Sequence, residues 1–126
     1  RAHKFDLLFI VSKWFLCLFA ASLRGEALRR VWDAVLCDGI EAVFRVAFAM
    51  LAQHSEAILR TRSMDDLIHM FQESHADPDP KELLRAAYDP ALIGQIGRAE
   101  LAQRRQQAVK RVVQGDTRSE MRQTAL

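Results

Sequence analysis

Two kinds of potentially reactive side chain occur together in the segment RRVWDAVLCDG, residues 29–39. Asp33 could serve there as a general base and Cys37 as a nucleophile. A thiolate nucleophile needs an electropositive setting and a nearby base, but Cys37 is followed by the acid Asp38 and has no histidine at helical spacing. Cys17 lies within an apolar run. Both cysteines are therefore expected to be reduced, buried, small apolar side chains rather than nucleophiles.

The remaining titratable residues do not form a site either. Two histidines have an acid close by in sequence, His54 with Glu56 and His69 with Glu73, but neither pair has a third ligand. The sequence contains no C-x-x-C pair and no glycine-rich phosphate loop. Acids at Asp65–Asp66 are better explained by the dipole of a helix that begins there. No metal and no catalytic residue are predicted.

Composition indicates a globular chain. Of its 126 residues, 50% are hydrophobic and 27% are charged, and the net charge of +2 gives no reason to expect a nucleic acid partner. The apolar run Leu7–Leu23 has the length of a short membrane span, but Lys13 falls near its middle. A lysine at mid-bilayer costs about 3 kcal/mol. A buried helix is therefore favoured over a membrane span.

The pattern along the chain predicts an all-α fold. Apolar residues recur at spacings of three and four, alternating β patterns are absent, and every proline lies between Pro78 and Pro90. The last helix is expected to stop at Gly115, with residues 116–126 as a frayed tail. The expected helices cover residues 6–23, 26–37, 41–53, 55–60, a segment that begins near 63, 80–87 and 95–114.

The second of these helices carries the segment that contains Asp33 and Cys37. Its apolar stripe predicts that Trp32 anchors the core and that Cys37 fills space. Asp33 is expected to pair with a basic side chain, either Arg30 or Arg45. Gly39 is expected to end the helix in the left-handed conformation. The inward residues predicted for this helix are Leu28, Val31, Trp32, Val35 and Leu36.

Three blocks in this order resemble the C-terminal half of a TBC domain, the all-helical fold that activates Rab GTPases. The family patterns are W-F-x-x-L-F, L-R-[VI]-W-D-x-x-x-x-[ED]-G and [LV]-F-R-V-A-x-A-[LM]-L. The matching residues are Trp14, Phe15, Leu18 and Phe19, then Arg30, Val31, Trp32, Asp33, Asp38 and Gly39, then Val43, Phe44, Arg45, Val46, Ala47, Ala49, Met50 and Leu51.

The resemblance implies a multi-helix orthogonal bundle, the C-terminal helical subdomain of the TBC fold, over residues 1–115. The match is strong over 12–59, loose over 63–74 and weak beyond. The family-signature residues, all expected to be structural, are Trp14, Phe15, Arg30, Trp32, Asp33, Gly39, Phe44 and Arg45.

The resemblance also implies a function in membrane trafficking. TBC domains insert an arginine finger from I-x-x-D-x-x-R and a glutamine finger from Y-x-Q into the Rab nucleotide site, and neither motif occurs in these residues. The chain is thus expected to be the half that braces the finger-bearing N-terminal half and helps to dock a Rab, with no catalytic residue of its own. GTP and Mg²⁺ would belong to the Rab, and the location would be cytoplasmic or peripheral on endomembranes. The alternative is a non-catalytic scaffold that binds a Rab or another helical partner.

Basic residues gather near the C-terminal end. The segment 98–122 has a net charge of +4 and could meet an acidic partner or an anionic membrane surface, at most peripherally. A solvated face on a terminal helix is the alternative. The seven basic residues are Arg98, Arg104, Arg105, Lys110, Arg111, Arg118 and Arg122.

Overall fold

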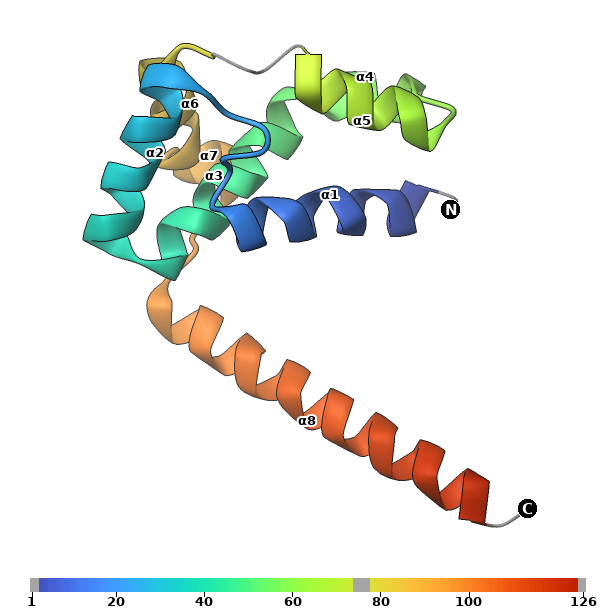
Figure 1. The fold of residues 1–126 in the computed structure, drawn as a ribbon. Coiled ribbons are helices and arrows are strands. Elements are labelled where there is room, and N and C mark those ends of the chain that lie inside the picture. Colours follow the sequence, from blue (N-terminus) through green and yellow to red (C-terminus); the bar gives the residue numbers. More distant parts are fainter. Residues whose placement is uncertain (1–2, 74–77, 125–126) are drawn as a thin grey trace. The chain divides into compact units, whose positions relative to one another are not determined.

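The computed structural model describes the backbone of residues 3–73 and 78–124 and the side chains of residues 7–71 and 78–115. Within these residues every regular element is a helix, which confirms the predicted all-α fold. The chain divides into two compact units, Arg1–Gln95 and Ile96–Leu126. The first unit contains α1 (His3–Cys17), α2 (Gly25–Asp38), α3 (Ile40–Gln53), α4 (Ser55–Arg60), α5 (Met64–Glu73), α6 (Pro80–Ala87) and α7 (Pro90–Ile93), and the second contains α8 (Arg98–Thr124) (Figure 1).

Helix α3 is the centre of the first unit. It packs against α2, α6 and α7, and also against α1, while α5 packs on α1 and α6 on α2. Its sequence explains this position, because both flanks of the helix are apolar and six of its side chains are buried. The largest fully buried side chains of the core are Trp14, Phe19, Leu23, Val31, Val43, Val46, Met50, Leu67, Phe71 and Leu83.

Local capping residues set the start of several helices. The Asp79 carboxylate accepts a hydrogen bond from the Lys81 backbone N–H at 2.9 Å, with Pro80 in the first turn of α6, as the sequence predicts. The Ser63 hydroxyl accepts from the Asp66 backbone N–H at 3.2 Å and begins α5. The short helix α7 was not predicted, although the same Asp-Pro arrangement starts it at residues 89–90.

The first helix ends earlier than predicted. α1 stops at Cys17, and Leu18 and Phe19 then take positive φ angles of 46° and 66°. These angles are unfavourable for side chains with a Cβ, so tertiary contacts must hold them. The turn lets Phe19 and Leu23 become buried, whereas Leu8 and Leu16 on the helix stay exposed. The prediction of one buried helix through Leu23 is wrong. None of the helices over the described residues is both long and apolar enough to cross a membrane.

The last helix ends later than predicted. α8 continues through Gly115 to Thr124, so it includes most of the segment that was expected to fray. A glycine costs only about 1 kcal/mol relative to alanine inside a helix, which is too little to end a helix without a capping motif. The predicted stop at Gly115 is wrong. The side chains of Arg118 and Arg122 lie outside the described residues.

Candidate functional site

Trp14, rather than Trp32, is the aromatic anchor of the core. Its side chain is fully buried, and its indole N–H donates to the Ser22 hydroxyl at 2.9 Å. The ring packs edge-on against Phe71 with centroids 5.2 Å apart, and against Phe19 at 5.9 Å. These contacts join α1 to α5 and to the turn after α1. The expected structural role of Trp14 therefore has a physical basis.

Trp32 lies on the outside of α2. Its side chain is 45% exposed, and its indole N–H donates to the Leu18 backbone carbonyl at 2.8 Å. Ala27 and Val31 are the buried residues of this helix, and Leu36, predicted to face inward, is 85% exposed. The predictions that Trp32 anchors the core and that Leu36 is buried are wrong, because the buried side of α2 is rotated away from them.

Asp33 lies on the same side of the helix as Trp32 and does not pair as predicted. Arg30 pairs instead with Glu26 at 3.0 Å, and Arg45 with Glu41 at 2.8 Å. Within the described part of the chain Asp33 forms no hydrogen bond or ion pair. Hydrogen bonds from Arg29 and Arg30 lower the pKa of Glu26. The two basic side chains that were expected to pair with Asp33 thus form ion pairs with Glu26 and Glu41 instead.

These residues form an exposed row that we call the outer face of α2. Its members, at helical spacings of three and four, all have exposed side chains: Arg29, Trp32, Asp33, Leu36 and Cys37. Trp32 and Leu36 supply its large apolar surface, one turn apart. Single exposed apolar residues are ordinary, but an indole and a leucine side by side form the kind of patch that a partner covers. Sequence periodicity missed this face because α2 has apolar residues on both sides.

A polar cluster closes the corner between α2 and α3. The Tyr88 hydroxyl at the end of α6 donates to the Asp38 carboxylate, and the Arg45 guanidinium lies over the Tyr88 ring at 5.1 Å. Arg45 also pairs with Glu41. Burial, and then the hydrogen bond to Asp38, raise the pKa of Tyr88 to about 12, so the hydroxyl remains a donor at neutral pH. The i,i+4 spacing of Glu41 and Arg45 predicts their pairing, but no local pattern marks Tyr88.

Three further family-signature residues connect helices of the first unit. Gly39 joins α2 to α3 with φ +70° and ψ −142°. The predicted positive φ is confirmed, but this ψ lies outside the left-handed helical region, in a region that is essentially restricted to glycine. The rings of Phe15 and Phe44 meet edge-on with centroids 4.9 Å apart and link α1 to α3.

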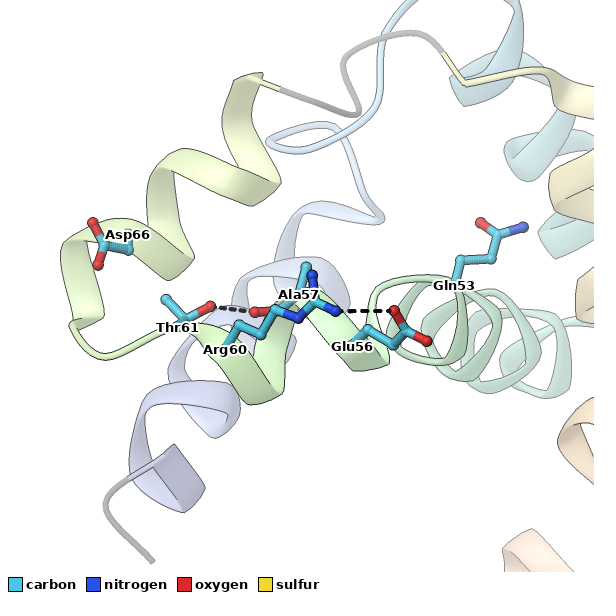
Figure 2. Close-up of a pocket in the computed structure, with 6 residues that line it drawn as sticks. All are labelled: Gln53, Glu56, Ala57, Arg60, Thr61 and Asp66. Carbon is cyan, nitrogen blue, oxygen red and sulfur yellow. Dashed lines mark hydrogen bonds and ion pairs between the residues drawn. The ribbon is translucent and has the colours of Figure 1, made fainter.

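A hollow beside α4 holds no cluster of candidate catalytic side chains. It has a volume of about 550 Å³ and is lined by residues of α3, α4, the following turn and the start of α5, all exposed except Thr61. Figure 2 shows Arg60 reaching towards Glu56, whose carboxylate is 3.8 Å away, while Gln53 and Asp66 stand at opposite ends. Leu59 on α4 is 82% exposed, whereas its neighbour Ile58 is buried. The hollow is open surface with charges that solvent screens.

The residues first considered for catalysis are not brought together. Cys17 and Cys37 are both exposed free thiols, so the prediction that they are buried is wrong. The His54 ring contacts the Met50 carbonyl at 2.6 Å and packs near Phe71, which is a structural role. Among the described residues no three His, Cys, Asp or Glu side chains could hold a metal ion, and the Glu73 side chain lies outside them. The residues first considered for catalysis therefore form no common site in the described part of the chain.

Comparison with known proteins agrees with the helical architecture. The profile of a family described as RabGAP TBC domain matches residues 2–81. The chain is 39% identical over 64 residues to human growth hormone-regulated TBC protein 1, a stretch that covers 51% of the chain and 19% of that protein. It is 44% identical over 70 residues to bovine TBC1 domain family member 2A, covering 56% of the chain and 7% of that protein. No solved structure matches significantly.

The chain thus belongs to the RabGAP TBC domain family. It spans about a fifth or less of the length of these curated relatives. The matched region contains all eight family-signature residues and the helices α1 to α5.

Proposed function

We propose that this chain is the bracing and docking half of a domain that stimulates GTP hydrolysis by a Rab GTPase in membrane trafficking. The observation that carries the proposal is the outer face of α2, where the family-signature residues Trp32 and Asp33 are exposed beside Leu36. A residue needed only for the core would be buried as Trp14 is. The exposed tryptophan instead fits a contact with the finger-bearing half or with the Rab.

The chemistry of activation assigns the catalytic groups to another segment. An arginine finger accelerates GTP hydrolysis about 10³–10⁵-fold by stabilising charge in the transition state. The 126 residues contain neither of the two finger motifs. GTP and Mg²⁺ would be bound by the Rab, and the chain itself would need no cofactor. Rab partners reside on membranes, so the chain would work in the cytoplasm or peripherally on endomembranes.

A single-turnover assay tests the proposal. GTP hydrolysis by a panel of GTP-loaded Rab proteins is measured with and without an excess of the 126-residue chain. The expected result is the intrinsic Rab rate in both cases, because no group of this chain reaches the transferring phosphoryl. Robust acceleration of any Rab by the chain alone would contradict the assignment of the fingers to another segment.

Docking through the outer face gives a second test. Leu36→Asp is expected to change the free energy of unfolding by less than about 0.5 kcal/mol, because the side chain is almost fully exposed. It should weaken docking at least about tenfold, since a charge replaces an apolar contact. Binding is measured with GTP-loaded Rab proteins and with the segment encoded directly upstream of Arg1.

Leu59→Asp supplies the matched control. Leu59 is 82% exposed on α4, away from the outer face, so the same change in chemistry should leave docking intact. Equal loss of docking in the two variants would argue against the outer face of α2 as the contact.

A non-catalytic scaffold is the second candidate, and the absence of both finger motifs from these residues is compatible with it. The coding sequence upstream of Arg1 discriminates between the two functions. An I-x-x-D-x-x-R motif and a Y-x-Q motif there would support the activator, whereas a Rab-binding domain without them would be a scaffold.

A further inference from the structure

Helix α8 presents nearly its whole described surface to solvent. Over residues 98–115 only Leu101 is partly buried, and every other side chain is exposed. The helix has 27 residues and belongs to the second compact unit, Ile96–Leu126. Helices in proteins gain most of their stability from packing of one face. A helix this exposed is therefore expected to bind another surface.

The charge of the helix is strongly one-sided. Residues 98–115 contain five basic residues and a single acid, Glu100, which gives a net charge of +4. Glu100 is already paired with Arg104, at 2.8 Å. Within the described residues Arg105, Lys110 and Arg111 form no ion pair. Three uncompensated cations therefore lie within two turns of the helix.

Exposed valines lie among these cations. Val109, Val112 and Val113 are 57%, 64% and 58% exposed. Their spacing of three and four residues places them on one side of the helix, within an arc of about 100°. Arg105 lies within this arc, one turn before Val109, and Lys110 borders it, whereas Arg111 lies on the opposite side of the helix. We call this group the valine–arginine patch: Arg105, Val109, Lys110, Val112 and Val113.

A second copy of the chain is a poor occupant for the patch. Pairing two such helices through their valines would bring four uncompensated cations together, two from each copy, and like charges at close range repel. The apolar row is also short, because Arg105 interrupts it on the N-terminal side. A coiled coil needs apolar residues sustained over several heptads.

A rigid protein groove is also disfavoured. Residues 98–115 contain no aromatic residue and no methionine, which are the usual anchors of protein interfaces. Short valines between long cationic side chains fit a soft, negatively charged surface better. There the valines reach the boundary between headgroups and acyl chains, while arginine and lysine extend to lipid phosphates.

We propose that the valine–arginine patch of α8 binds the surface of an anionic lipid bilayer, with the helix lying in the plane of the interface. Each basic side chain near such a surface strengthens binding about fivefold. The proposal does not depend on GTPase activation, since α8 lies outside the residues that the TBC family profile matches.

Vesicle co-sedimentation tests the proposal with the intact 126-residue chain. Vesicles of pure phosphatidylcholine are compared with vesicles in which about a third of the lipid is phosphatidylserine. The chain is expected to bind only the anionic vesicles, and binding should weaken as salt is raised. Equal binding to both compositions, or binding to neither, would overturn the proposal.

Two variants locate the contact. Arg105→Gln with Lys110→Gln should weaken binding about 25-fold. Val112→Gln with Val113→Gln keeps the charge and should weaken it about tenfold by removing apolar contact. Glutamine is a good helix former, and circular dichroism verifies that α8 remains helical.

The matched control also removes two charges, but from exposed positions of the first unit: Arg60→Gln and Arg62→Gln. This variant should still bind. Equal loss in the control would show that general charge, rather than α8, holds the chain to the vesicle. A concentration-dependent dimer in sedimentation velocity that is lost in the valine variant, without vesicle binding, would assign the patch to a second copy instead.

Discussion

Replacement of Trp14 by alanine is expected to lower the free energy of unfolding by about 3–5 kcal/mol. The side chain is fully buried and packs between Phe19 and Phe71, so its removal leaves a large cavity. It also removes the hydrogen bond that the Ser22 hydroxyl accepts from the indole N–H. Natural domains have only about 5–15 kcal/mol of stability, so the variant should be close to unfolding. Urea unfolding followed by circular dichroism measures the change.

Trp32→Ala is the matched control, because it deletes the same side chain from the outer face of α2. It should cost only about 1–2 kcal/mol, mainly through the lost hydrogen bond to the Leu18 carbonyl. The order of the two costs is the informative result. A larger loss for Trp32→Ala than for Trp14→Ala would mean that Trp32, and not Trp14, anchors the core.

Gly39→Ala is expected to destabilise the first unit by about 1–3 kcal/mol. A Cβ built at Gly39 would meet no atom within 4 Å, so the cost comes from the backbone conformation and not from a clash. With φ +70° and ψ −142° the residue lies outside the left-handed helical region that asparagine tolerates. Gly39→Asn should therefore be no better than Gly39→Ala. Unfolding followed by tryptophan fluorescence reports on the first unit, where both tryptophans lie.

Gly115→Ala makes the same chemical change where φ is not positive. Gly115 lies within α8, and an added Cβ meets nothing there either. The substitution should leave unfolding of the first unit unchanged and should increase helix content, because alanine is the better helix former. A Gly39→Ala variant as stable as the parent would show that the corner can relax to an ordinary turn.

Helix positions were predicted best where the signal is local. Asp79 and Pro80 specify the start of α6, and the serine and acids of residues 63–66 start α5, because a cap acts within one turn of its helix. The bounds of α4, Ser55–Arg60, were likewise predicted from the sequence. The family resemblance, carried by three blocks between Trp14 and Leu51, falls within residues 2–81, which the family profile matches.

Side-chain exposure was predicted less well, because it depends on neighbours that are distant in sequence. α2 has apolar residues around more than half of its circumference, and only its packing against α3 and α6 decides that Val31 is buried while Trp32 and Leu36 are not. The turn after Cys17 is another such case. No glycine or proline marks it, and it forms because Phe19 is buried beside Trp14.

The hydrogen bond between Tyr88 and Asp38 indicates that the folded domain extends beyond the residues that the family profile matches. The family profile stops at residue 81, yet Leu83 and Ala87 belong to the core and the Tyr88 hydroxyl donates to Asp38, an acid inside the matched region. A polypeptide truncated at residue 81 would keep every residue that the family profile matches. It would lose the core side chains Leu83 and Ala87. The segment that identifies the domain is thus shorter than the segment that must fold together, which reaches α7.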